Sequence, residues 1–235
     1  MTGPGLPVLP VSRLLLWRHG RTDWNASGRF QGQLDPPLDA QGRQEASRAA
    51  PHLIAGGLAA EDTVVVTSDL SRAAETAEVV AALLGVPLIR DRRLREHGLG
   101  CWEGLTRKEV AERHPEQYAD WLAGRPVRGR GGEEPADVAA RALAALADLP
   151  PAGTAVVVTH SGTVGRLLEA LLQLGPGQRR LLGPLGNCNW SELLFHGDRW
   201  RLMRHNSSAP GPLEGHRCGP VGGAAATAGD AEAAL

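Results

Sequence analysis

The stretch from Leu14 to Asn25, LLLWRHGRTDWN, joins an apolar run to a cluster of cationic and polar side chains. The run ends at Arg18 and His19, and Arg21 and several small donors follow within a few residues. A guanidinium group holds phosphate through two parallel hydrogen bonds, and a neutral imidazole can act as a nucleophile toward phosphorus. The stretch therefore predicts an anion site at the end of a buried strand.

Three more apolar runs, at 63–67, 86–89 and 155–159, predict buried strands. They alternate with helical segments, which favours a mostly parallel sheet covered by helices on both faces. We therefore predict an α/β fold, a three-layer α/β/α sandwich. In such sheets, ligands bind beyond the carboxyl ends of the strands.

The residues that follow these strands fit the same chemistry. Ser68 and Arg72 come after the second strand, Glu96 lies in the longer loop after the third, and His160 follows the fourth directly. Phosphoryl transfer requires positioning, charge neutralisation, a nucleophile and a proton carrier. The four strand exits supply two imidazoles, two or three arginines and one carboxyl group. We expect them to surround one phosphoryl group, with one imidazole neutral and the other protonated.

The remaining elements are predicted from capping residues and periodicity. We expect a helix capped by Asp39 that Pro51 kinks or opens near its end, a helix from Ser71 to Gly85, and one or two helical pieces in 106–122. Further helices are expected over 136–149 and Thr163–Leu174, and two late strands over 188–195 and 199–206 with a turn at His196–Asp198.

Composition limits the class of protein. The chain has 235 residues and a net charge of −1, which gives no electrostatic reason to expect nucleic acid or a membrane as a partner. No apolar run approaches the roughly 20 residues that span a bilayer, and the Pro-rich start does not resemble a signal peptide. Three scattered cysteines argue against a disulfide framework, so we expect a cytoplasmic protein. Lys108 is the one lysine among 25 basic residues, which is typical of a high-GC bacterial genome.

Segment composition predicts three regions. We expect a loose N-terminal arm over residues 1–12, a single catalytic domain over 13–206 with a lid at about 104–135, and a disordered Gly/Ala/Pro-rich tail over 207–235.

Taken together, the motifs RHG, FQGQLDPPLDAQG, SDLSRAAETA, LREHGLGCWEGL, GGEE and VVVTHSG resemble the histidine phosphatase superfamily, which includes phosphoglycerate mutases. The resemblance covers roughly residues 14–206 in order. It implies the phosphoglycerate mutase-like fold and a phosphohistidine intermediate on His19. It also implies a phosphate pocket formed by Arg18, Arg72 and His160, with Glu96 as the proton donor.

The same resemblance implies smaller roles for other positions. Asn25 and Gln31 would donate hydrogen bonds to phosphoryl oxygens. Gly20 and Gly162 would let the backbone approach the anion, and the amide of Ser161 or Gly162 would donate to it. Arg21 is a possible third phosphate ligand or a surface residue in an Arg-rich chain.

Two assignments have competitors. Glu103 could be the acid in place of Glu96, but its position before the 106–122 segment indicates a helix cap. Five arginines of the predicted lid could bind an acidic substrate or only solvate a loop: Arg107, Arg113, Arg125, Arg128 and Arg130. The usual GGES reads GGEE here, so Glu134 adds an acid to that loop.

The predicted function is hydrolysis of a small phosphorylated metabolite without a cofactor or metal. The segment between Glu103 and Asp137 lacks the long insertion of cofactor-dependent mutases, which favours a phosphatase over a phosphoglycerate mutase. The late segments resemble actinobacterial members, including glucosyl-3-phosphoglycerate phosphatases, although general phosphatases share them. A metal hydrolase that uses His19 and His160 is a second enzymatic alternative, but no HxH or HxxxH spacing in the sequence supports it. A phosphate-binding protein without turnover is the non-enzymatic alternative. A homodimer through a late strand is possible.

Overall fold

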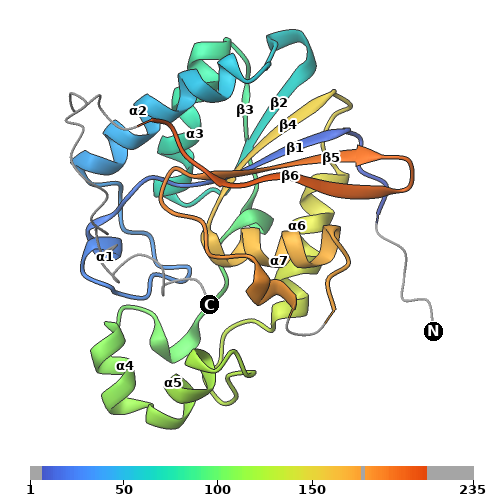
Figure 1. The fold of residues 1–235 in the computed structure, drawn as a ribbon. Helices are drawn as coiled ribbons and strands as arrows, with labels where there is room; N and C mark the ends of the chain where they lie inside the picture. Colours follow the sequence, from blue (N-terminus) through green and yellow to red (C-terminus); the bar gives the residue numbers. More distant parts are fainter. Residues whose placement is uncertain (1–6, 176–177, 211–235) are drawn as a thin grey trace, which may run out of the picture.

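A computed structural model describes residues 7–175 and 178–210 of the chain (Figure 1). Within them, six strands form one sheet in the order β3-β2-β4-β1-β5-β6. The strands are β1 (Arg13–Arg18), β2 (Thr63–Thr67), β3 (Leu88–Arg90), β4 (Thr154–Thr159), β5 (Trp190–His196) and β6 (Arg199–Ser207). The first four are parallel, whereas β5 pairs antiparallel with β1 and β6 antiparallel with β5.

Helices cover both faces of this sheet. Along β1, Leu14 and Leu16 pack in one core with α6 (Pro135–Ala147) and α7 (Ser161–Leu171). Leu15 and Trp17 point the other way, into a second core with α2 (Ala40–Ala55) and α3 (Ser71–Leu84). The two helix pairs lie on opposite sides of the sheet in Figure 1. Because alternate residues of a strand face opposite sides, a run of apolar residues needs two covered faces, and the predicted three-layer α/β/α fold is confirmed.

A smaller lobe lies apart from the sheet and contains α4 (Arg107–Arg113) and α5 (Pro115–Leu122), drawn in green at the bottom of Figure 1. Its own core is formed by Phe30, Trp102, Val110 and Trp121. The centroid of the Phe30 ring lies 5.2 Å from that of Trp102 and 5.5 Å from that of Trp121, which it contacts edge-on. The predicted helical pieces in 106–122 are therefore confirmed, and aromatic packing holds them together.

The other helical elements are short. They are α1 (Asp23–Ala26) and the 3₁₀ turns η1 (Ala60–Asp62), η2 (Arg92–Leu94), η3 (Gly100–Trp102) and η4 (Gln178–Leu181).

Helix ends follow local chemistry in most cases. The Asp39 side chain accepts a hydrogen bond from the Gly42 amide at 2.8 Å and caps α2 as predicted. Gly85 ends α3 with φ +70°, a conformation that favours glycine. Pro51 does not end α2, which continues to Ala55. The cap of α4 is Thr106, in a capping box with Glu109.

The predicted segment boundaries need corrections. The arm over residues 1–12 is packed at its end, because Val11 is buried and the Pro10 carbonyl accepts a hydrogen bond from Ala152, whereas Val8 is exposed. Strand β6 extends to Ser207, and most of the predicted tail, residues 211–235, lies outside the described residues. The late hairpin is confirmed, with Gly197 and Asp198 as its turn.

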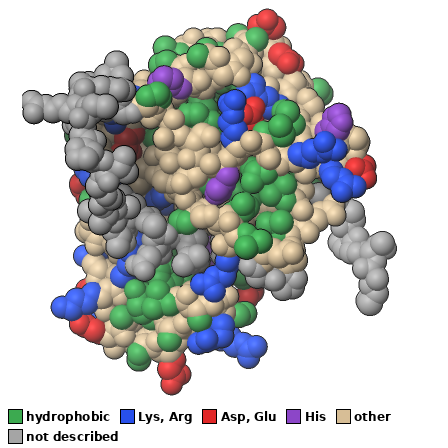
Figure 2. All heavy atoms as spheres, viewed as in Figure 1, with side chains coloured by type: hydrophobic (Ala, Val, Ile, Leu, Met, Phe, Trp, Pro, Cys, Tyr) green, Lys and Arg blue, Asp and Glu red, His purple; other side chains and the backbone are tan. Residues whose placement is uncertain are grey.

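Two properties of the described residues bear on membrane and metal binding. None of the helices there is both long and apolar enough to cross a membrane. No group of three or more His, Cys, Asp or Glu side chains in the same residues could hold a metal ion. On the face shown in Figure 2, basic side chains are scattered among acidic and apolar ones.

Candidate active site

The ends of β1, β2 and β4 lie side by side, and a cavity of about 70 Å³ opens near them. We call it the inner cavity. Its wall includes eight residues that the sequence brought forward: Arg18, His19, Asn25, Gln31, Arg72, Glu96, Arg107 and Ser161. The strand exits therefore meet around one space, as expected for a parallel sheet.

The ring of His19 is fixed by its own chain. Its Nδ1 lies 2.7 Å from the carbonyl oxygen of Gly20, and a carbonyl only accepts hydrogen bonds. Nδ1 must therefore carry the proton, which leaves the lone pair on Nε2. A neutral ring in this tautomer has its nucleophilic nitrogen opposite the backbone contact.

His160 lies beside this ring, with centroids 5.1 Å apart, and is fully buried. Its Nε2 is 2.9 Å from the Ser68 hydroxyl, whose oxygen also accepts a hydrogen bond from the Leu70 amide. The Leu70 amide uses one lone pair of the Ser68 oxygen, and the Ser68 hydroxyl can donate its own proton to His160 Nε2. The proton of the neutral His160 ring is then on Nδ1. Nδ1 is buried without a hydrogen-bond partner. His160 does not itself line the inner cavity but lies directly beside His19, which does, so its contact with a bound phosphate stays a prediction.

Burial lowers the pKa of both histidines well below the ordinary value. The charges of Arg72 and Arg18 lower the pKa of each ring further. Both rings are therefore neutral near pH 7 in this structure. Neutral His19 fits a nucleophile, and protonation of the second imidazole beside a bound phosphoryl group stays a prediction.

Arg18 and Arg72 place two charges in this low-dielectric region. Arg72 is fully buried and donates to the carbonyls of Gly32, at 2.9 Å, and Leu34, at 2.7 Å. Desolvation lowers the pKa of Arg72 to about 10, so it remains charged at neutral pH. Arg18 donates to the Leu185 carbonyl at 2.5 Å. Among the described residues, the acceptors of Arg72 at hydrogen-bond distance are carbonyls, and the Asp35 carboxylate is 3.9 Å away, so an incoming anion would offset the cost of its burial.

Asn25 and Gln31 also reach the inner cavity. The Asn25 carbonyl oxygen accepts hydrogen bonds from the amide and hydroxyl of Thr22, which fixes the side chain and leaves its NH₂ group to donate. Gln31 is buried, and its Oε1 has no partner. Asn25 therefore fits donation to a phosphoryl oxygen, whereas the atom of Gln31 that lacks a partner among the described residues is an acceptor.

Glu96 is held at the start of α7. Its Oε1 accepts from the amides of His97, at 2.8 Å, and Thr163, at 3.0 Å, and its Oε2 accepts from the Gly162 amide at 3.1 Å. A side chain at Gly162 would overlap the Glu96 carboxyl group. Gly162 therefore makes room for Glu96, and its amide is already used, which corrects its predicted approach to the phosphate.

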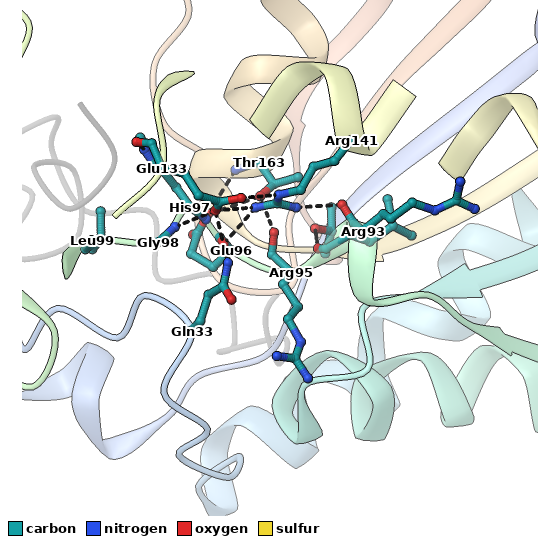
Figure 3. Close-up of polar contacts among 12 residues, drawn as sticks. Gln33, Arg93, Arg95, Glu96, His97, Gly98, Leu99, Glu133, Arg141 and Thr163 are labelled. Atoms are coloured by element: carbon teal, nitrogen blue, oxygen red, sulfur yellow. Dashed lines mark hydrogen bonds and ion pairs between the residues drawn. The ribbon is translucent and has the colours of Figure 1, made fainter. Parts of the chain in front are cut away.

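A second group of side chains holds the backbone of Glu96 (Figure 3). Arg141 donates to the carbonyls of Arg93, at 2.6 Å, and Glu96, at 2.9 Å. The same guanidinium pairs with Glu133 at 2.7 Å, and Gln33 donates to both Glu133 and the Glu96 carbonyl. We call Arg141, Glu133 and Gln33 the backbone clamp. They orient the loop on which the candidate acid lies.

Other predicted roles are not supported by these contacts. Arg21 does not line the inner cavity, since it pairs with Asp39 at 2.8 Å. The Gly20 amide donates to Thr76, and a side chain at Gly20 would overlap the Gly42 carbonyl. Gly20 thus permits close packing of α2 rather than approach to an anion.

Glu103 does not cap α4, because its carboxylate accepts from the amides of Gln33, at 3.1 Å, and Leu99, at 2.8 Å. Glu103 lines neither the inner cavity nor the second cavity that adjoins it and is described below.

The sequence did not single out some of the cavity wall. Arg29, Trp24 and Leu99 also line the inner cavity. Ser161 has a buried hydroxyl without a partner. A composition in which nearly every basic residue is Arg gives no signal that would separate Arg29 from surface arginines.

A second cavity of about 210 Å³ adjoins the first, and we call it the outer cavity. Phe30, Glu96 and Leu99 line both cavities. The outer cavity extends between the lobe and α7, past Trp121, Arg130 and Arg166. Glu96 therefore lies where a ligand would pass from one cavity to the other.

A paired-imidazole site with buried arginines at the strand ends of a three-layer α/β/α fold defines a phosphoryl-handling enzyme. The family model of the histidine phosphatase superfamily (branch 1) matches residues 14–208, and the chain belongs to this superfamily.

Named relatives agree with this assignment. A glucosyl-3-phosphoglycerate phosphatase from Mycolicibacterium vanbaalenii is 37% identical over 85% of this chain and 96% of its own. A probable phosphoglycerate mutase from Yersinia enterocolitica is 36% identical over 80% of this chain and 87% of its own. The solved structure of a mycobacterial glucosyl-3-phosphoglycerate phosphatase with VO3 matches with a TM-score of 0.74 and 38% identity, covering 84% of this chain and all of that one. The prediction of a histidine-type phosphatase is thereby confirmed.

Proposed function

We propose that the protein hydrolyses phosphate monoesters of small metabolites through a phosphohistidine on His19. The observation that carries the proposal is the contact of His19 Nδ1 with the Gly20 carbonyl, because it leaves the Nε2 lone pair on a ring that lines the inner cavity. Arg18, Arg72 and Asn25 line the same cavity and would hold the phosphoryl oxygens.

In the first step, His19 Nε2 attacks phosphorus. The P–N bond forms as the P–O bond to the leaving group breaks, and Glu96 gives its proton to the leaving oxygen. In the second step, water attacks the phosphohistidine and loses its proton to Glu96, which releases inorganic phosphate and neutral His19. Glu96 is proposed over Glu103 because only Glu96 lines the cavities.

His160 is proposed as a hydrogen-bond donor to the phosphoryl group. Its unpartnered Nδ1, next to the His19 ring, supports this role, since a buried donor without an acceptor is costly. Ser68 would keep the proton on that nitrogen.

The substrate class follows from the relatives and the outer cavity. Two relatives act, by name, on glucosyl-3-phosphoglycerate, so a phosphorylated sugar acid or a related metabolite is the proposed substrate. A phosphoglycerate mutase is the second candidate, because the Yersinia relative carries that name. We propose cytoplasmic action, with Cys101 and Cys188 free. A homodimer through β6, an edge strand of the sheet, stays a prediction.

Assays on p-nitrophenyl phosphate test the proposal. The wild type should hydrolyse it without bisphosphoglycerate and in the presence of a chelator, and His19→Ala should be inactive. His52→Ala, at an exposed position of α2, is the matched control and should match the wild type. Wild-type turnover in His19→Ala would overturn the mechanism, and no turnover in the wild type would support a binding protein instead.

A further inference from the structure

Arg130 is a buried guanidinium that the mechanism above does not use. It is 9% exposed, and its Nε has no hydrogen-bond partner. Among the residues that the structure describes, no carboxylate lies within ion-pair distance of it. Burying a charged group without acceptors is costly, so such a group marks a place where a ligand can supply them.

Among the described residues, the guanidinium has a polar contact with His97, which is not an acceptor. Arg130 Nη2 lies 3.4 Å from His97 Nε2. That nitrogen is also 2.7 Å from the Glu133 carbonyl oxygen, which requires a proton on Nε2. A protonated Nε2 that donates to Glu133 has no lone pair for the guanidinium, so the contact with His97 gives Arg130 no acceptor. Nε of Arg130 also lacks an acceptor among the described residues.

The side chain is nevertheless held in position. Its guanidinium carbon lies 5.3 Å from the centre of the Trp102 ring, a cation–π distance. The Arg130 carbonyl accepts a hydrogen bond from the Cys101 amide at 3.0 Å. Gly132 has φ +82°, and a side chain there would overlap the Gly98 carbonyl. Close backbone packing between these two loops thus fixes where Arg130 lies.

Arg130 lines the outer cavity, His19 lines the inner cavity, and Glu96 lines both. An ester whose phosphorus meets His19 has its leaving oxygen beside Glu96. The rest of the leaving group then extends into the outer cavity, toward Arg130.

Most other charges around the outer cavity are already neutralised. The pairs are Arg125 with Asp120, Arg166 with Glu169, and Glu133 with Arg141. Glu134 is exposed and also lines the cavity. Arg130 is thus the cation of this wall without an ion-pair partner among the described residues, and two acids, Glu96 and Glu134, share the wall. With so little positive charge, the cavity suits a singly charged anion better than a second phosphate group.

We propose that Arg130 binds a carboxylate on the leaving group and so selects phosphate esters of hydroxy acids. The inference rests on the proposed phosphatase function and assigns the substrate class at the same site. A guanidinium binds a carboxylate through two parallel hydrogen bonds, which gives both affinity and orientation.

Matched substrates test this proposal on the full chain. We would compare 3-phosphoglycerate with glycerol 3-phosphate, which differ by the carboxylate, and fructose 1,6-bisphosphate with fructose 6-phosphate, which differ by a second phosphate. The variant is Arg130→Met, and Arg125→Met is the control because Arg125 lines the same cavity but is paired with Asp120. Hydrolysis of p-nitrophenyl phosphate checks that each variant retains a working site.

The wild type should prefer 3-phosphoglycerate, and Arg130→Met should lower kcat/KM for it by about 10- to 100-fold, mainly through KM. The same variant should leave glycerol 3-phosphate and p-nitrophenyl phosphate nearly unchanged. Equal losses on both esters would show a structural role and overturn the inference, as would no preference for the carboxylate in the wild type. An Arg130-dependent preference only for the bisphosphate would also overturn it. Failure of the wild type on p-nitrophenyl phosphate would instead refute the proposed function.

Discussion

The imidazole rings of His19 and His160 lie with their centroids 5.1 Å apart and their planes inclined by 60°. Both rings are buried near Arg18 and Arg72, and their pKa values are lowered well below the ordinary value by burial first and by these charges second. The arrangement keeps a pair of neutral rings beside two cations. An arriving phosphoryl dianion would change that balance, because negative charge beside the rings favours their protonated form.

The lowered histidine pKa values predict a stability that depends on pH. The unfolded chain takes up protons at an ordinary histidine pKa near 6.5, whereas the folded protein takes them up only at lower pH. The unfolded state therefore binds more protons below about pH 6.5, and the free energy of unfolding should fall as the pH drops from there, by up to ~1.4 kcal/mol per pH unit for each ring.

Urea unfolding at several pH values between 7.5 and 5 checks this. His160→Gln should flatten the fall, although its stability at pH 7.5 will be lower, and His52→Gln should not change the slope. An equal slope in wild type and His160→Gln would mean that the buried rings do not cause the dependence.

Glu96→Gln should slow hydrolysis according to the leaving group. The variant cannot protonate a leaving oxygen, which matters for an alkyl ester and little for p-nitrophenolate. The first step with glycerol 3-phosphate should slow by about 10²–10⁴-fold, and the first step with p-nitrophenyl phosphate far less. Single-turnover kinetics on both esters measure this, and the same loss on both would remove Glu96 from the role of acid.

The backbone clamp predicts a positioning effect. Arg141→Met removes donors to the Glu96 and Arg93 carbonyls and leaves the Glu133 carboxylate without its cation. We expect a loss of about 2 kcal/mol in the free energy of unfolding and a lower kcat with little change in KM. Arg90→Met, in an exposed pair with Glu78, is the control. If Arg141→Met loses stability but keeps kcat at temperatures where it is folded, the clamp supports only the fold.

Glu134→Ser tests the acid at the rim of the outer cavity. Removing this charge should lower KM for 3-phosphoglycerate by a few-fold, since an exposed charge contributes about 0.2–1 kcal/mol. High salt should reduce the difference between variant and wild type. An unchanged KM would mean that Glu134 does not act on an anionic leaving group.

Much of the fold and part of the site follow from local sequence. The apolar runs before Arg18 and His160 could be placed in strands, and parallel strands bring their carboxyl ends together, so the two histidines were expected at one edge. Asp39 identifies a helix start because its side chain accepts a hydrogen bond from an amide of the first turn. Gly85 identifies a helix end because glycine adopts the left-handed backbone conformation that ends the helix.

The remaining features depend on contacts between distant segments. Arg18 and Arg21 flank the same histidine, and only the position of Asp39 turns Arg21 away from the cavity. Glu103 could not be separated from a helix cap without knowing that the amides of Gln33 and Leu99 reach it. The outer cavity depends on two loops packing across Gly132, so the lack of an acceptor for Arg130 has no signature in the sequence.

The most direct test of the mechanism is to trap the phosphorylated residue. Glu96→Gln mixed with p-nitrophenyl phosphate should transfer the phosphoryl group quickly, because nitrophenolate needs no proton, and should hydrolyse the intermediate slowly for lack of a base. Rapid quenching in alkali followed by peptide mass spectrometry should then find an acid-labile phosphoryl group on His19, close to one per chain. A burst of nitrophenol with no phosphoryl group on His19, or with the group on His160, would contradict the account.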